Sequence, residues 1–260
     1  MAVIGVVLAA GAGAALAQMT APPADLVTRK GWEVGGLLSN YKYEEPDFMW
    51  LRGDRIGASG AYTMTNSKRV YARFEGRASY GELDYEGSGT MSNVPDYLIE
   101  VRALVGRDYA LGSTMAWSPY FGVGLRYLYN DLRGTTSTGQ FGYRRESTYM
   151  YIPVGVTLRM PMGSEWVLVP QAEYKGLLRG VQRSYLSDTG LPLNDISNQQ
   201  RQGRGYRVQV MFEGRRWSIG PWLDYWDIKD SDLQQIAPGL VGMEPANWTR
   251  EAGVEVRYRF

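Results

Sequence analysis

The chain of 260 residues carries 28 Lys and Arg against 27 Asp and Glu, a formal net charge of +1, so its overall charge does not favour nucleic-acid binding. It contains neither Cys nor His, which excludes disulfides, thiol or imidazole catalysis, and metal sites built on those side chains. Gly (32), Tyr (19) and Trp (8) are abundant, a composition that favours strands, turns and aromatic belts over helices.

The first predicted element is a signal peptide at residues 1–17. No charged residue occurs before Asp25, and an apolar run rich in Gly and Ala leads to "ALAQ", with the small-x-small pattern of a cleavage site. The run is too short and too rich in small residues to make a good transmembrane helix. We therefore expect export, cleavage after Ala17, and a periplasmic N-terminal segment over residues 18–29.

The remaining residues, 30–260, alternate apolar and polar side chains with a period of two, as strands do. In one segment, for example, Ala72 and Phe74 share one face while Arg73 and Glu75 share the other. We predict about ten strands of this kind. They cover residues 31–43, 49–63, 69–81, 96–107, 117–129, 148–160, 165–178, 204–214, 216–227 and 250–260.

The connections between these strands alternate in length. Short turns such as "TNSKR" and "MPMGSE" alternate with long polar loops at 130–147, 179–203 and 228–249, although "EEPD" is shorter and "GRDYALGSTMAWS" longer than this pattern requires. Short turns at one end and long loops at the other are typical of outer-membrane barrels, with both chain termini at the short-turn end. A ten-residue strand tilted about 45° spans about 23 Å, close to the height of the apolar band.

These features predict an all-β fold, an antiparallel up-and-down transmembrane β-barrel of about ten strands, with a range of eight to twelve. Aromatic residues near the ends of the apolar faces, such as Trp166 and Tyr174, fit the girdles at the two membrane interfaces. A soluble periplasmic calyx, with the apolar faces turned inward, is the alternative fold.

The chain ends on "AGVEVRYRF", with Val254, Val256, Tyr258 and Phe260 on one strand face. Together with the signal peptide and the alternating strands, this ending resembles that of Gram-negative outer-membrane β-barrel proteins, in which a C-terminal aromatic residue is part of the signal for the barrel-insertion machinery. The resemblance covers the architecture of the mature chain and no individual family. It implies a location in the bacterial outer membrane, contact with outer-membrane lipid and lipopolysaccharide, and a monomer.

Because barrels known as enzymes in this group rely on a catalytic His, the absence of His indicates a non-enzymatic protein. We expect no catalytic residue, no cofactor and no metal ligand. A hydrolase that uses carboxylates alone is an alternative, although clustered acids in loops are usually solvated charges. The candidate acids are Glu44, Glu45, Asp47, Asp227, Asp230 and Asp232.

Charges of both signs lie on the strand faces that we expect to line the lumen. The predicted lumen network consists of Glu33, Arg73, Glu75, Arg77, Glu100, Arg102, Arg126, Arg159, Glu173, Lys175, Arg207, Asp224, Glu255 and Arg257. Two interpretations stay open. The charges either pair and fill a narrow barrel, or line a small-solute channel, because interiors fill at about eight strands and wide pores appear at about sixteen.

The long loops carry Ser, Thr, Asn, Gln, Tyr and Arg, which suits surface binding, adhesion or a structural role in the envelope. The extracellular ligand itself is unknown. Guanidinium groups match phosphate geometry, so loop arginines are candidate contacts to lipopolysaccharide. These are Arg133, Arg144, Arg145, Arg179 and Arg183.

Overall fold

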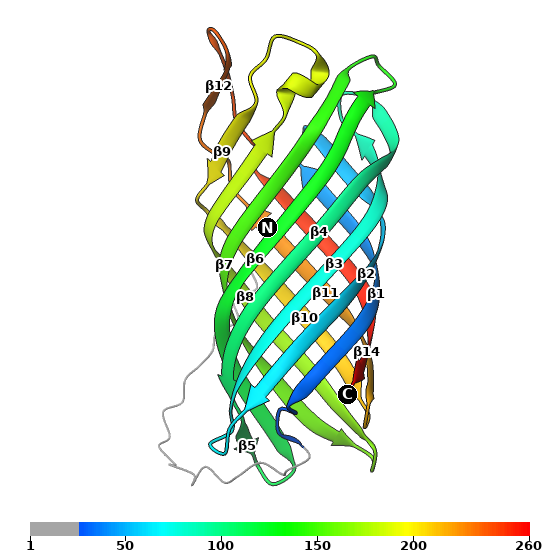
Figure 1. Ribbon diagram of the computed structural model, residues 1–260, viewed down its shortest axis with the longest axis vertical. Coiled ribbons are helices and arrows are strands. Elements are labelled where there is room, and N and C mark those ends of the chain that lie inside the picture. The colour runs from blue at the N-terminus through cyan, green and yellow to red at the C-terminus, as the bar shows by residue number, and fades with distance from the viewer. Residues whose placement is uncertain (1–25) are drawn as a thin grey trace, which may run out of the picture.

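The computed structural model describes residues 26–260, so the predicted signal peptide and most of the predicted segment 18–29 lie outside the described residues. Ten long antiparallel strands form a closed barrel (Figure 1). They are β1 (Gly31–Glu45), β2 (Met49–Thr65), β3 (Val70–Glu86), β4 (Thr90–Arg107), β6 (Met115–Thr135), β7 (Phe141–Met162), β8 (Trp166–Ser184), β10 (Gly203–Glu213), β11 (Trp217–Ile228) and β14 (Asn247–Arg259). The all-β fold class and the up-and-down topology are therefore confirmed.

Closure comes from the pairing of the first strand with the last. β1 pairs with β2 on one side and with β14 on the other, where the register runs from Glu33 opposite Arg259 to Glu44 opposite Trp248. Every long strand therefore has two neighbours, which removes the unpaired edges of an open sheet. Among the described residues, no helix is long and apolar enough to cross a membrane.

Five short elements complete the fold at the two ends of the barrel. They are β5 (Tyr109–Leu111), the 3-10 helix η2 (Leu186–Thr189), β9 (Ile196–Gln200), β12 (Gln234–Ala237) and β13 (Leu240–Gly242). β5 pairs with the start of β6, so the long connection "GRDYALGSTMAWS" is a hairpin at the short-turn end. Figure 1 shows β9 and β12 at the opposite end, beyond the rim of the barrel.

The predicted loop boundaries were wrong at this extracellular end. β6 and β7 continue through most of the predicted loop 130–147, so that the turn between them covers only residues 136–140, and β8 continues to residue 184 in the predicted loop 179–203. In this region the outward face carries polar side chains such as Arg144 and Glu146, while polar residues such as Asn130 and Arg145 are buried on the inner face, so the sequence loses the apolar and polar contrast from which strands are predicted. Backbone pairing nevertheless continues, for example between Tyr129 and Glu146.

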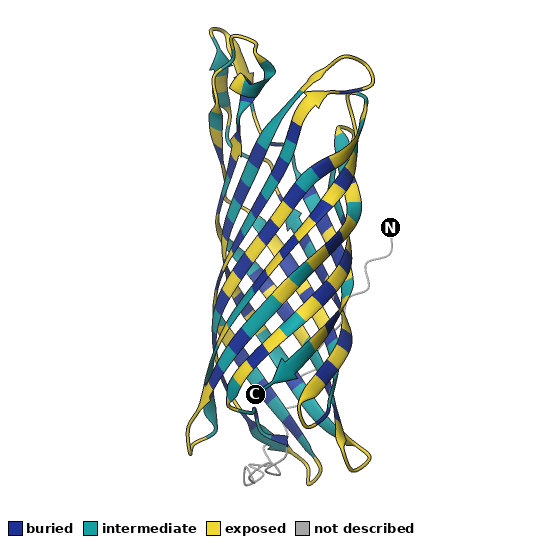
Figure 2. Ribbon diagram, turned by 45° about the vertical axis from the view of Figure 1, so that its right-hand side comes forward, coloured by how far each residue is buried: buried dark blue, intermediate teal, exposed yellow. Residues whose placement is uncertain are grey.

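Buried and exposed residues alternate along each strand (Figure 2). Apolar side chains on the outer face are widely exposed; Leu38 and Ile56 each expose 64%. Aromatic side chains gather at both ends of this apolar band, with Trp217 against Tyr258 near the short turns and Tyr80 against Tyr97 near the long loops. The outer face therefore suits a lipid environment with two interfacial girdles.

The lumen is packed with large side chains rather than open. In its extracellular half, Tyr41, Tyr149, Tyr151 and Trp226 belong to a continuous apolar cluster and are at most 4% exposed. Gly124 makes room for Tyr151, because a Cβ atom there would lie 2.2 Å from the Cζ atom of the tyrosine ring. Packing of this kind closes the extracellular half of the barrel.

Candidate functional site

A network of buried ion pairs occupies the middle of the lumen. The Nζ atom of Lys175 lies 2.6 Å from an Oδ atom of Asp224, and a guanidinium nitrogen of Arg77 lies 3.3 Å from the same carboxylate. Glu100 lies 2.8 Å from the Nε atom of Arg77 and accepts a hydrogen bond of 2.7 Å from the Tyr151 hydroxyl. Lys175 is fully buried, so these charged groups are stabilised by one another rather than by hydration.

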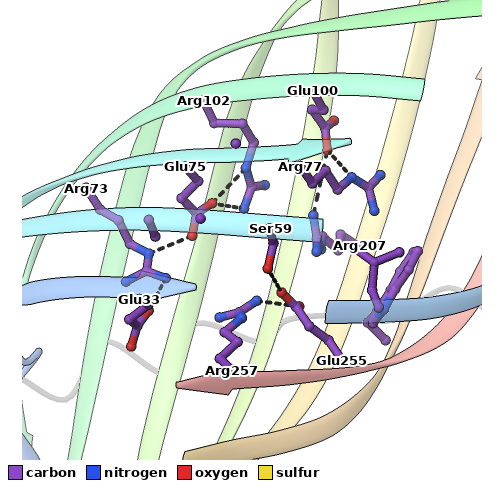
Figure 3. Close-up of a pocket in the computed structure, with 15 residues that line it drawn as sticks. Glu33, Ser59, Arg73, Glu75, Arg77, Glu100, Arg102, Arg207, Glu255 and Arg257 are labelled. Carbon is purple, nitrogen blue, oxygen red and sulfur yellow. Dashed lines mark hydrogen bonds and ion pairs between the residues drawn. The ribbon is translucent and has the colours of Figure 1, made fainter. Parts of the chain in front are cut away.

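A second layer of ion pairs lies nearer the short-turn end (Figure 3). Arg73 bridges Glu33 and Glu75, with 2.6 Å to each carboxylate. Arg102 extends the chain of contacts from Glu75 to Glu173, whose carboxylate lies 2.8 Å away. Nitrogen-to-oxygen distances of this size are typical of charge-assisted hydrogen bonds between a guanidinium group and a carboxylate.

Every residue of the predicted lumen network lies on the inner face and is buried or half-buried. The structure joins most of them into one system, since Glu100 and Asp224 connect Arg77, Lys175 and Arg207 across the barrel. Arg126 is the least engaged member, with a single ion pair of 3.8 Å to Asp224.

Sequence reasoning missed several charged residues of the same interior, among them Arg55, Asp96 and Glu251. Arg55 forms an ion pair with Asp96, approaches Glu251 at 3.6 Å, and stacks over Tyr41 with 3.4 Å to the ring centre. Asp96 and Glu251 share the strand parity of Glu100 and of Glu255, which were predicted to face inward. All three lie inside the predicted strands 49–63, 96–107 and 250–260, so following the alternation along the whole of each strand would have found them.

The short-turn end of the lumen is closed by the start of the described chain. Leu26 is fully buried in an apolar cluster with Ala116 and Met211. The Thr28 amide and hydroxyl donate hydrogen bonds of 2.8 and 2.7 Å to Asp108. Residues that sequence analysis assigned to a periplasmic segment thus sit inside the barrel mouth.

Two small cavities lie within the lumen. One of about 30 Å³ is lined by Arg77, Arg207 and Trp222, and a second of about 60 Å³ lies beside Thr28 and Tyr71. Each has room for only a few water molecules. Aromatic residues near the extracellular end, ion pairs in the middle and Leu26 near the short turns therefore occupy successive levels of the lumen.

A buried cluster lies at the extracellular mouth. Arg145 on β7 contacts Glu45 at the end of β1 and Glu244 in the connection before β14. The Tyr43 hydroxyl lies 2.7 Å from Glu45 and 2.9 Å from Glu244. Burial raises the pKa of the Glu244 carboxyl to about 7. The positive charge of Arg145 lowers this pKa and the negative charge of Glu45 raises it, so Arg145 offsets burial only in part.

Arg145 was predicted to be an exposed loop contact, and that prediction was wrong. Only 4% of the residue is exposed, because β7 continues through this position and the alternation turns it inward. Of the other predicted loop arginines, Arg133 pairs with Asp131 and Arg144 with Asp188. The remaining two, Arg179 and Arg183, are exposed on the outer face of β8.

The clustered loop acids serve separate structural contacts. Glu44 pairs with Lys42, and Asp227 lies 3.1 Å from the Lys229 ammonium. Asp230 and Asp232 accept hydrogen bonds from backbone amides of the neighbouring loop and strand. In the part of the chain that the structure describes, no group of three or more acidic side chains is placed to hold a metal ion.

A family model described as "Outer membrane protein beta-barrel domain" matches residues 7–176, more than half of the chain. The protein belongs to this family. Its location is the bacterial outer membrane, as the girdles and the apolar band indicate. A search of curated proteins finds no match.

Solved structures similar to this outer-membrane barrel include proteins of different kinds. The outer membrane protease OmpT from Escherichia coli has a TM-score of 0.55 at 10% identity, covering 88% of this chain and 95% of that one. The β domain of the Bordetella autotransporter BrkA has a TM-score of 0.40 at 13% identity, with 89% and 100% covered. Ail, the attachment invasion locus protein of Yersinia pestis, has a TM-score of 0.33 at 7% identity, with 89% and 100% covered. The likeness to OmpT shows the fold alone.

Proposed function

We propose that this barrel is a non-conducting, non-enzymatic protein that binds a partner outside the cell through its extracellular lobe. The lobe consists of residues 185–202 and 229–246, which include η2, β9, β12 and β13. Backbone contacts join its two parts: the Asn194 amide donates to the Ile236 carbonyl at 2.8 Å, and the Asp232 amide to the Gln199 carbonyl at 3.2 Å.

The observation that carries this proposal is the apolar surface of the lobe. Several of its side chains expose between 43% and 62% of their area. They are Leu191, Leu233, Leu240, Val241 and Met243. The lobe stands beyond the membrane, where lipid does not cover these side chains, and exposed apolar groups of this kind mark interaction sites. The partner class that fits is an extracellular protein with an apolar contact surface.

The packed lumen supports the non-conducting part of the proposal and disfavours the small-solute channel. The absence of His and the separate structural contacts of the loop acids support the non-enzymatic part. A carboxylate-only hydrolase would need two acids facing a common substrate position. Glu45 and Glu244 come together, but both are buried against Arg145.

The test of binding uses cells that display the protein on surfaces coated with fibronectin, laminin or collagen. The variant Leu233→Ser with Leu240→Ser and Val241→Ser should lose most of the adhesion, because it removes the exposed apolar surface. The matched control is Phe48→Ser, which removes an apolar side chain that is 66% exposed on the turn between β1 and β2. Equal adhesion of wild type and triple variant on every surface would refute lobe-mediated binding.

Planar-bilayer recordings test the closed lumen separately. Refolded wild-type protein should insert without discrete conductance steps. Steps whose ion selectivity changes in Arg102→Glu would instead establish a channel along the lumen, because Arg102 lies directly in that path.

A further inference from the structure

Three cations lie side by side on the outer face of the barrel, at the extracellular end of β14, β1 and β2. The backbone register places Lys42 directly opposite Arg250 of β14 and directly opposite Arg52 of β2. Arg52 and Arg250 are exposed, and Lys42 is half-buried. We call Arg250, Lys42 and Arg52 the cationic row.

The cationic row lies at the level of the lipid headgroups. Leu38, four residues below Lys42 on the same face of β1, pairs with Val254 and Ile56, and all three are widely exposed apolar residues. Four residues along a tilted strand correspond to about 9 Å along the membrane normal. The row therefore lies just beyond the apolar band.

Two tryptophans stand on either side of the next row outward. Glu44, two residues after Lys42, is paired with Trp248 on β14 and with Trp50 on β2. The Lys42 ammonium lies 5.1 Å from the centre of the Trp248 ring and forms an ion pair with Glu44. Tryptophan side chains prefer this interfacial depth.

The charges of the cationic row are incompletely matched. Like charges at directly opposed cross-strand positions are destabilising. Glu44 forms an ion pair with Lys42, but within the described chain neither Arg52 nor Arg250 takes part in an ion pair. Asp84, directly opposite Arg52 on β3, does not come within ion-pair distance of it. Among the described residues, the guanidinium groups of Arg52 and Arg250 therefore have no carboxylate at ion-pair distance.

We infer that the cationic row binds the phosphorylated headgroup of an outer-leaflet glycolipid. The two guanidinium groups contact the phosphate oxygens, for which their planar forks are suited. The rings of Trp50 and Trp248 lie beside the sugar, and the acyl chains cover Leu38 and Ile56 below. This inference depends on the outer-membrane location and is independent of partner binding by the lobe.

The experiment measures lipid binding to the full refolded protein in detergent micelles by native mass spectrometry. The probes are diphosphorylated lipid A and the same glycolipid without phosphate. The test variant is Arg52→Gln with Arg250→Gln. The control is Arg204→Gln with Lys229→Gln, which removes the same charge from rim positions that already share the acidic partner Asp227. Heat-modifiable gel mobility verifies that each variant forms the barrel.

Wild type should bind the phosphorylated lipid more tightly than the dephosphorylated one, and the test variant should weaken that binding by about tenfold or more. The control variant should retain wild-type affinity. Equal affinity of wild type and test variant, or an equal loss in the control, would overturn the inference. Displacement of the lipid by millimolar inorganic phosphate would assign the site to free phosphate and would also contradict it.

Discussion

Glu45 and Glu244 contact the same atom, the Nη2 nitrogen of Arg145. Glu45 ends β1, whereas Glu244 belongs to the extracellular lobe, so the shared guanidinium joins the lobe to the barrel wall. Two carboxylates at one cation repel each other, and such a pair holds a proton more tightly than an isolated acid. The contact therefore links lobe position to pH.

Docking of the lobe should weaken as pH rises from about 5 to 7. The pKa of Glu244 is raised from 4.5 to about 7 in the folded protein, chiefly by burial, so the docked state binds more protons than the released state across this window. The docked state of the lobe is thus most stable at acidic pH, and this stabilisation is lost as the pH increases through 7. Hydrogen exchange of the backbone amides of Met243, Glu244 and Ala246, corrected for the intrinsic rate, measures this.

The variant Glu244→Gln should remove the pH dependence, because a neutral amide replaces the titrating acid opposite Arg145, Glu45 and Tyr43. Glu165→Gln, on an exposed turn at the other end of the barrel, should keep it. A wild-type lobe whose protection is constant between pH 5 and 8 would contradict the link.

Lys175→Met should destabilise the barrel by about 3–5 kcal/mol, because loss of the ammonium leaves Asp224 with one fewer cation in the lumen. Lys229→Met is the matched control, since its ammonium is solvent-exposed and its partner Asp227 is only half-buried, and it should cost less than about 1 kcal/mol. Urea unfolding in detergent micelles compares the two. Similar losses for both lysines would mean that the lumen pair contributes no more than a surface pair.

Leu26→Asp should unseat the N-terminal segment from the short-turn mouth, because a carboxylate cannot be buried against Ala116 and Met211 without large cost. The chain has no Cys, so single cysteines can report accessibility. Ala116→Cys should react with a thiol reagent much faster in the Leu26→Asp background. Ser67→Cys, on an exposed turn, should react at the same rate in both. Unchanged protection of Ala116→Cys would show that the segment does not seal the mouth.

Phe260→Ala should lower the amount of assembled protein in cells several-fold while leaving the stability of refolded protein nearly unchanged. The Phe260 ring is 75% exposed and contributes little packing beyond its contact with Tyr258. Its expected role is recognition by the insertion machinery, together with Val254 and Val256. Phe121→Ala, which also removes an outward and 62% exposed ring, should assemble normally. Equal assembly of both variants would remove Phe260 from the insertion signal.

Local periodicity was enough to predict much of this protein. The alternation placed Arg73 and Glu75 on the inner face and Phe74 on the lipid face, because successive side chains of a strand point to opposite faces of the sheet. The same rule places Asp96 and Glu251 on the inner face, and they were missed because the inner faces of the predicted strands 96–107 and 250–260 were not followed to their ends.

The sequence by itself determined the barrel class, the strand alternation and the absence of His and Cys chemistry, since these depend on neighbouring residues and composition alone. Only the tertiary structure decided which charges meet. Arg145 forms ion pairs with Glu45 and Glu244, each about a hundred residues away in the sequence, and Lys175 forms an ion pair with Asp224 across the lumen. Strand register and barrel closure set those distances, and neither is encoded in any short stretch of the chain.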